Sequence, residues 1–280
     1  MGKSSEKMGE ALKGFTDFHC HILPALDDGP GSINESIEMA RGLNSLGFNE
    51  IYCTPHLMRG VFDNHKERIE LAVLDLKTAL DENGIAVTLH AAVEYCLDEF
   101  LLDFLDQPMP MGENIVLVEA YRQVQPQFLA EALYKVVVLK HLRPLIAHPE
   151  RYDMFDAILP ERRKQRFSGG LWPWNWNSLP LVDRREYSFH DDRETLNSMR
   201  SMGCLFQGNI GSFAGIYGER IKTRALRMLE LGLYDHLGTD AHKPQKIAHW
   251  IEKGLKVIEQ ETGKEELTKL ISTPAGQLVG

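Results

Sequence analysis

Histidines and carboxylates recur at short, regular spacings along this chain. The segment "TDFHCHILPALDDGP", residues 16–30, contains His19 and His21 one residue apart, followed by Asp28. Near the other end, "GTDAH" contains Asp240 and His242 at the same spacing. Side chains two residues apart on a strand point to the same face, so each pair converges on one point. Imidazoles and carboxylates that converge in this way are typical ligands of a catalytic metal ion.

Other segments of strand-like composition also end in residues that can bind metal. These residues are His56 in "CTPH", Glu94 in "AAVEY", Glu119 in "VLVEA" and His148 in "IAHPER". The whole candidate set is His19, His21, Asp28, His56, Glu94, Glu119, His148, Asp240 and His242. Four carboxylates packed together without cations would each lose hydration at a cost of several kcal/mol. We therefore expect bound cations at this cluster.

The composition of the candidate set indicates which metals suit it and how many ions it can hold. Imidazole and carboxylate ligands without thiolate favour Mn, Fe or Zn in a catalytic site over a structural zinc. The set exceeds what one ion can use, so we expect two or three ions, with Glu94 as a candidate bridge. Neighbouring ions in such clusters can share a hydroxide nucleophile.

The elements that position these residues alternate along the chain. Seven β-rich runs are each followed by a stretch of helical character; they cover residues 15–23, 49–55, 85–95, 114–120, 143–149, 204–212 and 235–242. Such alternation predicts parallel βαβ units, and seven of them predict an α/β fold of the (β/α)7 barrel type. The active site of a parallel barrel lies at the carboxyl ends of its strands, where the candidate ligands fall.

Local signals mark helix ends and one irregular segment. Ser32 with Glu35, and Asn64 with Glu67, have the spacing of capping boxes, while Gly47 and Gly84 are predicted to end the two helices that follow those caps. We expect one domain over residues 1–280, interrupted by an irregular, tryptophan-rich insert at about 160–190. The loop "NIGSFAGIYGER", residues 209–220, matches no phosphate-loop pattern and is expected at the barrel mouth.

Length, charge and cysteine content exclude several classes of protein. The 280 residues are 43% hydrophobic, which is enough for a sizeable core, and the net charge of −9 disfavours a nucleic-acid partner. We find no signal-peptide core and no apolar run that approaches a membrane span, and expect a cytoplasmic protein without membrane insertion. The four cysteines lie far apart without a CxxC pair, so neither a thiolate zinc site nor a disulfide framework is predicted.

The segment "CTPHLMR" offers an alternative to the metal site. Cys53 and Arg59 have the Cys-x5-Arg spacing of cysteine-dependent tyrosine phosphatases. That mechanism requires a loop of backbone N–H groups around the phosphate, but Pro55 removes one donor and the loop contains no glycine. We therefore favour the metal site. Asp17 and His90, each on the ligand face of its strand, are considered as partners that orient the ligands.

The motifs together resemble a known family. "DFHCHILPALDDG", "TPH", "VEY", "VEA", "IAHPERY", "QGNIGS" and "TDAH" follow, in order, those of the bacterial PHP-family (polymerase and histidinol phosphatase) tyrosine phosphatases of capsule and exopolysaccharide loci, the CpsB/YwqE type. The resemblance covers about residues 15–250 without the insert. It implies a distorted TIM-like barrel and a trinuclear centre that usually contains manganese.

The resemblance also implies roles for individual residues. His19, His21 and Asp240 would hold one ion, shared through Glu94 with a second held by Glu119 and His148; Asp28, His56 and His242 would hold the third. Arg151 would bind the substrate phosphate, and with Asp240 and His242 it makes up the catalytic set. The family commonly has a second arginine after "DAH", whereas this chain has only Lys243 or Lys246 to replace it.

These observations predict a metal-dependent phosphatase for phosphotyrosine in proteins, acting through a metal-activated hydroxide. The resemblance implies that the substrate is a bacterial tyrosine kinase that controls polysaccharide export. The sequence is also compatible with two alternatives: a small-molecule phosphatase of the histidinol-phosphate type, and a non-catalytic scaffold with structural metals. The sequence leaves the oligomeric state open.

Overall fold

The structure, a computed structural model, describes residues 14–156 and 192–272. The insert expected at about 160–190 lies outside the described residues. Among the residues that are described, no helix is long and apolar enough to cross a membrane.

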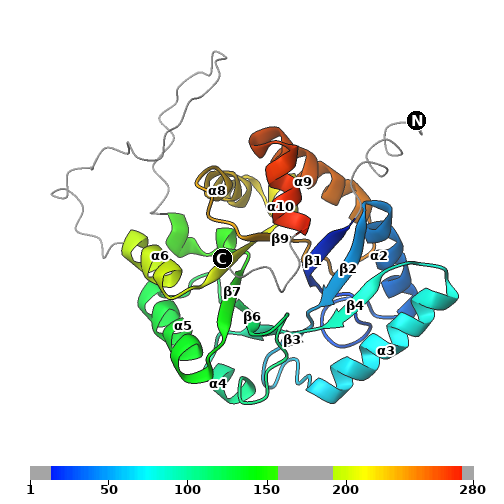
Figure 1. Ribbon diagram of the computed structural model, residues 1–280, viewed down its shortest axis with the longest axis horizontal. Helices are drawn as coiled ribbons and strands as arrows, with labels where there is room; N and C mark the ends of the chain where they lie inside the picture. Colours follow the sequence, from blue (N-terminus) through cyan, green and yellow to red (C-terminus); the bar gives the residue numbers. More distant parts are fainter. Residues whose placement is uncertain (1–13, 157–191, 273–280) are drawn as a thin grey trace, which may run out of the picture.

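The strands form two sheets in which all neighbours are parallel. The smaller sheet has the order β1-β2-β4, with bounds Phe15–Cys20, Phe48–Cys53 and Thr88–Ala91. The larger has the order β3-β5-β6-β7-β8-β9, with bounds His56–Leu57, Glu94–Cys96, Ile115–Glu119, Arg143–Ala147, Leu205–Asn209 and His236–Gly238. The strands surround a common centre and the helices lie outside them (Figure 1). The expected α/β fold with parallel strands is confirmed.

Two of the predicted strands are divided in the structure. The run 49–55 gives β2 and continues into β3, and the run 85–95 gives β4 and then β5. Both breaks lie where the chain passes from the smaller sheet to the larger. Pro55 has no N–H to donate to a strand ladder, which explains the first break. Backbone hydrogen bonds still link the two neighbouring segments where the strands are interrupted. Ala92 N donates to Cys53 O at 3.0 Å, and Glu94 N donates to Pro55 O at 3.2 Å.

The outer edges of the two sheets meet beside β1 and β9. Cys20 and Ala241 form a parallel bridge, and Asp240 N donates to His19 O at 2.6 Å. This contact places the end of the chain's first strand directly beside the residues that follow its last strand. Both segments carry predicted ligands.

The ends predicted for two helices are confirmed, and so is one of the two predicted caps. The long helices are α2 (Ile33–Ser45), α3 (Lys66–Glu82), α5 (Pro126–Lys140), α6 (Asp192–Ser201), α8 (Glu219–Glu230), α9 (Ile247–Thr262) and α10 (Lys264–Ser272), with short α4 (Leu101–Phe104), α7 (Ile210–Ala214) and the 3-10 turns η1 (Pro149–Arg151) and η2 (Asp153–Asp156). The Ser32 side chain caps α2 as predicted. Gly47 and Gly84, with φ of 97° and 64°, follow the ends of α2 and α3 as expected.

The cap predicted for α3 is wrong by one residue. His65 accepts the hydrogen bond from Arg68 N at 3.2 Å and is the cap. Asn64 is buried, and its side-chain amide donates to the carbonyls of Leu26 and His56 at 3.0 and 2.8 Å. Asn64 therefore holds the backbone of a predicted ligand in place.

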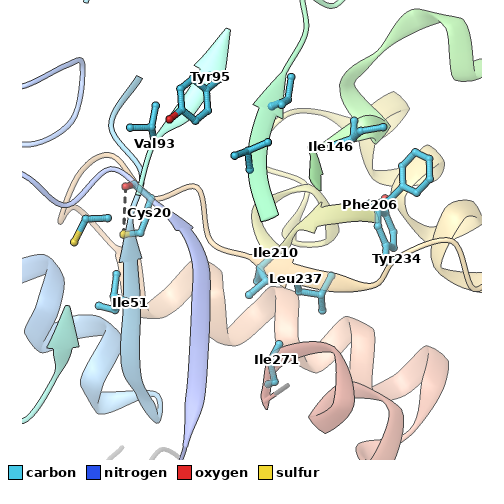
Figure 2. Packing of buried hydrophobic residues seen from close by; sticks show 14 of the residues in the cluster. Cys20, Ile51, Val93, Tyr95, Ile146, Phe206, Ile210, Tyr234, Leu237 and Ile271 are labelled. Atoms are coloured by element: carbon cyan, nitrogen blue, oxygen red, sulfur yellow. Dashed lines mark hydrogen bonds between the residues drawn. The ribbon is translucent and has the colours of Figure 1, made fainter. Parts of the chain in front are cut away.

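Buried hydrophobic side chains form a large cluster and a smaller one. The large cluster joins the sheets to the surrounding helices, and Ile210, Leu237 and Ile271 in Figure 2 belong to it. The smaller cluster consists largely of strand residues, among them Phe18, Leu117 and Leu145. Packing on both faces explains why the strands read as continuous apolar runs.

Candidate active site

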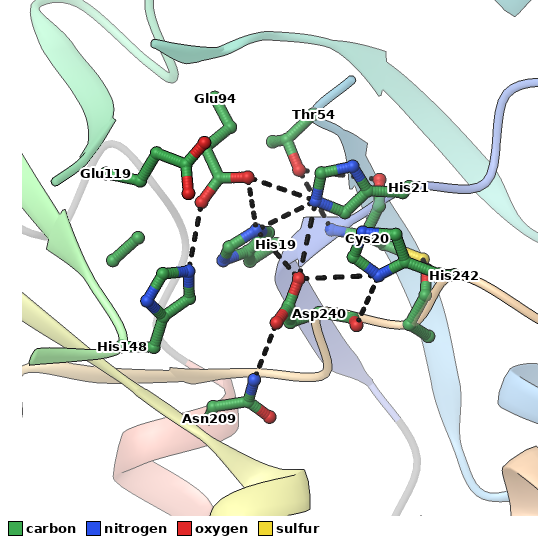
Figure 3. Close-up of polar contacts among 12 residues, drawn as sticks. His19, Cys20, His21, Thr54, Glu94, Glu119, His148, Asn209, Asp240 and His242 are labelled. Carbon is green, nitrogen blue, oxygen red and sulfur yellow. Dashed lines mark hydrogen bonds and ion pairs between the residues drawn. The ribbon is translucent and has the colours of Figure 1, made fainter. Parts of the chain in front are cut away.

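The structure brings all nine predicted ligands together. Most lie at or just after the carboxyl end of a strand, whereas His56 and Glu94 are the first residues of β3 and β5. Figure 3 shows part of the set, including His19, His21, Glu94, Glu119, His148, Asp240 and His242. Their side-chain atoms form three overlapping groups, within each of which all ligand atoms lie within 4.8 Å of one another. The groups are His21, Asp28, His56 and His242; His19, Glu94, His148 and Asp240; and His56, Glu94 and Glu119. Asp28, His56 and His242, which were predicted to hold the third ion, all fall in the first group. His19 and His21, which were predicted to hold one ion together, fall in different groups. Metal binding itself stays a prediction at this point.

Glu94 lies at the centre of the cluster and is fully buried. Its Oε2 atom lies 3.2 Å from His19 Nε2, 3.1 Å from His21 Nε2 and 3.1 Å from His56 Nδ1. Its Oε1 atom lies 3.2 Å from His148 Nε2. One carboxylate thus contacts four imidazoles, which is the arrangement expected of a bridging ligand.

In their neutral form, the imidazoles of His19 and His21 would direct unprotonated nitrogens into the cluster. His19 Nδ1 lies 2.8 Å from Gln207 Oε1, and His21 Nδ1 lies 2.8 Å from Asp27 Oδ2. Both oxygens are acceptors, so each neutral ring carries its proton on Nδ1. The two Nε2 lone pairs then face each other at 3.1 Å. A cation between them and the carboxylates removes this repulsion, so the donor set fits a metal centre.

The pKa shifts in the cluster arise from the close approach of its imidazoles and carboxylates. Burial opposes a charge on His19, but the carboxylates of Glu94 and Asp240 outweigh it and raise the pKa. Burial likewise opposes the charged form of Glu94, but the imidazoles of His19 and His148 hold its pKa well below the usual range. The site therefore has an electrostatic demand for positive charge, which divalent ions meet.

Two residues that orient the ligands were not found from the sequence. Gln207 fixes the ring of His19, while Asp27 fixes that of His21 and also accepts from His56 N at 3.0 Å. The "DD" pair contained a signal, but it did not distinguish the ligand Asp28 from the orienting residue Asp27.

The two orienting partners considered from the sequence have other contacts. Asp17 does not contact an imidazole; its carboxylate accepts from the backbone N–H groups of His19 and Thr239, at 3.2 and 2.9 Å. Burial raises the pKa of Asp17 to about 6. His90 lies on β4, where its ring stacks on Tyr52 with centroids 4.7 Å apart. The interpretation failed for His90 because β4 and β5 are separate strands.

Two candidate ligands have left-handed backbone conformations that L-residues rarely adopt. His148 has φ of 33° and Asp240 has φ of 52°. Such conformations cost of order 1–3 kcal/mol each and persist where the surroundings fix them, often at functional sites. Here each residue follows the end of a strand and turns its side chain toward the cluster (Figure 3).

A cavity of about 420 Å³ opens beside the ligands. It is lined by Asp28, His56, Glu119, His148, Arg151, Tyr217, Asp240, His242 and Lys243. Two of these residues, Arg151 and Lys243, are cationic. Lys243 Nζ donates to the carbonyl of Gly29. Lys246, the other predicted phosphate contact, is exposed at the start of α9 and is not among the lining residues.

Asp240 joins the ligand cluster to the cationic side of this cavity. Its Oδ1 atom lies 3.3 Å from His19 Nε2 and 3.4 Å from His21 Nε2. Its Oδ2 atom accepts from Arg151 Nη2 at 2.5 Å and from Asn209 Nδ2 at 2.8 Å. One carboxylate oxygen thus faces the ligands and the other fixes an arginine at the cavity.

The geometry disfavours a thiol mechanism at Cys53. The Cys53 side chain is fully buried within β2, opposite Cys20 of β1. Burial raises the pKa of this thiol. A buried neutral thiol cannot serve as the nucleophile.

The sequence matches one protein family over nearly its whole length. Residues 15–162 and 181–280 match the family described as "Capsular polysaccharide synthesis, CpsB/CapC". The chain belongs to this family. The predicted resemblance is therefore confirmed. The match leaves out residues 163–180, which fall within the tryptophan-rich insert.

Two named relatives are similar to this protein over most of the chain. Tyrosine-protein phosphatase YwqE of Bacillus subtilis (strain 168) is 29% identical over 257 residues, which cover 89% of this chain and 85% of YwqE. Tyrosine-protein phosphatase CpsB of Streptococcus pneumoniae is 22% identical over 262 residues, covering 91% of this chain and 93% of CpsB.

Solved structures agree with the sequence relationship. A chain from the crystal structures of YwqE and CpsB, described as unique metal-dependent tyrosine phosphatases, superposes with a TM-score of 0.71 at 27% identity, covering 91% of this chain and 90% of that one. Histidinol phosphate phosphatase from Lactococcus lactis superposes with a TM-score of 0.51 at 14% identity, covering 90% and 95% of the two chains. The latter likeness concerns the fold alone.

Proposed function

We propose that this protein is a metal-dependent protein-tyrosine phosphatase. The observation that carries the proposal is the convergence of nine candidate ligand side chains beside a cavity, which six of them line together with Arg151 and Lys243. Such a site offers places for cations and for a phosphate dianion side by side. Membership of the CpsB/CapC family and the similarity to YwqE support the same activity.

We infer that the nine ligands hold two or three ions, with manganese as the expected metal and Fe or Zn as alternatives. Glu94 is the proposed bridge, since its two oxygens face different imidazoles. When bound, the ions would supply an activated water for attack on phosphorus and positive charge for the phosphoryl oxygens.

The chain's own residues would bind and orient the substrate. Arg151 is proposed to donate N–H groups to the phosphoryl oxygens and to stabilise their charge as the P–O bond breaks. Lys243 would add a second, single-point contact in place of the family's arginine. Asp240 and His242 complete the proposed catalytic set, with Asp240 also fixing Arg151.

We further propose the fold that surrounds the site, the location of the protein and its substrate. The seven βα units, two of them with divided strands, would together form a distorted (β/α)7 TIM-like barrel. We place the protein in the cytoplasm, with a bacterial tyrosine kinase that controls polysaccharide export as its substrate. The capsular context of the family supports this assignment.

The metal mechanism is tested against the thiol mechanism by two variants. Chelation should abolish turnover of a phosphotyrosine peptide, and Mn²⁺ should restore it. Cys53→Ala should keep most activity because the thiol is buried, whereas His148→Ala should lose activity by orders of magnitude because a ligand is removed. Histidinol phosphate serves as the comparison substrate for kcat/KM. Loss of turnover in Cys53→Ala with metal still bound would contradict the proposal, as would a preference for histidinol phosphate.

A further inference from the structure

Tyr217 lies at the cavity in a position that a short, glycine-rich loop creates. The loop between α7 and α8 holds Tyr217 between Gly215 and Gly218, whose φ values are 81° and 93°. A side chain at Gly211 would lie 2.6 Å from Ile216 Cδ1 and 3.0 Å from Tyr217 Cε2. The absence of a side chain at Gly211 therefore lets Tyr217 fold back toward β8. Apart from histidines, Tyr217 is the aromatic residue among those that line the cavity in the described part of the chain.

The ring of Tyr217 contacts the guanidinium of Arg151. The guanidinium carbon lies 4.0 Å from the ring centroid, within the range of a cation–π contact. The Tyr217 hydroxyl lies 3.4 Å from Asn209 Nδ2, and the same amide donates to Asp240. Arg151 itself donates to Asp240. The ring thus covers one face of the guanidinium while Asp240 takes one N–H group.

The remaining N–H groups of Arg151 point to the need for a ligand. Arg151 Nε is buried and has no hydrogen-bond partner among the described residues. Buried donors are normally satisfied, so an unsatisfied one beside a cavity indicates an absent acceptor. Without the ring, the guanidinium would be free to turn and pair more fully with Asp240, since that carboxylate is its nearest charge. The ring therefore fixes the direction in which Arg151 can donate.

We propose that Tyr217 is a positioning residue for phosphate recognition, acting through Arg151. Its aromatic face holds the guanidinium so that the unpaired donors stay available to a phosphoryl group in the cavity. This inference rests on the proposed function, since it assigns to Arg151 the contact with phosphate. The phenol hydroxyl has no part in it.

The test measures binding of inorganic phosphate to the manganese-loaded protein by calorimetry, with metal content determined on the same samples. Tyr217→Leu removes the aromatic face and should weaken phosphate binding roughly 5- to 30-fold with metal content unchanged. Tyr217→Phe keeps the ring and should retain most of the affinity. Tyr134→Leu, at an exposed tyrosine of α5, is the matched control and should leave binding unchanged.

A double-mutant cycle separates positioning from a general structural role. In the Arg151→Ala background, Tyr217→Leu should cause little further loss of phosphate affinity, because the group it positions is gone. Additive losses would overturn the proposal, as would loss of metal from Tyr217→Leu, equal damage by Tyr217→Phe, or no phosphate binding by the unmodified protein. Failure of the proposed function would give a different result. The unmodified protein would bind phosphate, and the double-mutant cycle would show the expected coupling, but the protein would hydrolyse no phosphotyrosine peptide.

Discussion

At the scale of single residues, the site depends on carboxylates that face in two directions. Asp27 is such a residue, because one oxygen of its carboxylate accepts from both the His21 ring and the His56 backbone. Burial opposes its charge, but the hydrogen bond from His21 prevails and lowers the pKa of Asp27 to about 2. Asp27 is therefore ionised throughout the physiological range and orients two proposed ligands.

Removal of this charge should weaken metal binding. In Asp27→Asn the amide cannot accept from both donors with the strength of a carboxylate, and we expect metal affinity to fall about 10- to 100-fold. Metal content after dialysis against graded chelator measures the effect. Asp75→Asn, an exposed aspartate of α3, is the control. Equal metal retention in the two variants would contradict the assigned role of Asp27.

The ligand residues were predictable because each lies in or just after a strand-like run, and parallel strands bring their carboxyl ends together. Gln207 and Asp27 were not, since orientation of a ring depends on which side chains point at its second nitrogen. That information exists only in three dimensions. Tyr217 was hidden for the same reason: the sequence showed a glycine-rich loop but not which ring it would turn toward Arg151.

At the scale of elements, glycine residues inside helices set how closely helices approach their neighbours. Gly254 of α9 packs on the start of α7, where an added Cβ would lie 2.4 Å from the carbonyl oxygen of Ile210. Gly42 of α2 packs on a side chain instead, with an added Cβ 2.5 Å from Ile247 Cγ2. Both glycines lie inside helices. A side chain at Gly254 would displace backbone, whereas one at Gly42 would displace only a side chain.

Alanine substitutions at these two glycines should therefore have different costs. Each gains about 0.5–1 kcal/mol from helix propensity. Gly254→Ala forces backbone apart, and we expect a net loss of about 1–3 kcal/mol in the free energy of unfolding. Gly42→Ala should lose less, because a side chain can shift. Urea unfolding of both variants measures the difference; a greater loss in Gly42→Ala would refute this account of the packing.

The elements themselves were mostly predictable, with instructive exceptions. Each of the seven predicted runs contains a strand, because apolar strand composition is a local property. The division of the run 85–95 was not visible, since "HAAVEY" has no residue that interrupts a strand. The cap of α3 moved from Asn64 to His65 because burial of the Asn64 amide against two carbonyls outweighed local capping preference.

At the scale of the whole molecule, the C-terminal helix is joined to the inner strands through a buried histidine. His236 of β9 donates from Nδ1 to the carbonyl of Leu270 in α10 at 3.0 Å, and its ring lies 4.0 Å from that of Phe18. Burial lowers the pKa of His236 to about 4. The folded protein thus keeps this ring neutral at pH values where the unfolded chain is protonated.

The consequence is a dependence of stability on pH. The unfolded chain takes up a proton near pH 6.5 that the folded chain refuses until about pH 4, so stability is full above pH 6.5 and falls as the pH drops toward 4. The loss amounts to roughly 2–3 kcal/mol. Glutamine does not titrate. In His236→Gln, the free energy of unfolding measured with denaturant should therefore fall less between pH 7 and 4, by about the same 2–3 kcal/mol. The metal-site groups titrate equally in both proteins, so their contribution cancels. Parallel profiles would contradict the assignment.

The contact between the ends of the two sheets has a consequence for synthesis of the protein. Cys20 and Ala241 form a bridge although 221 residues separate them in the chain. Contacts over such separations are costly to close and form late in folding. The proposed ligands His19 and His21 lie on one side of this contact, and Asp240 and His242 lie on the other. A chain still growing on the ribosome therefore cannot offer the complete proposed ligand set, and we expect metal loading to follow the emergence of residue 242.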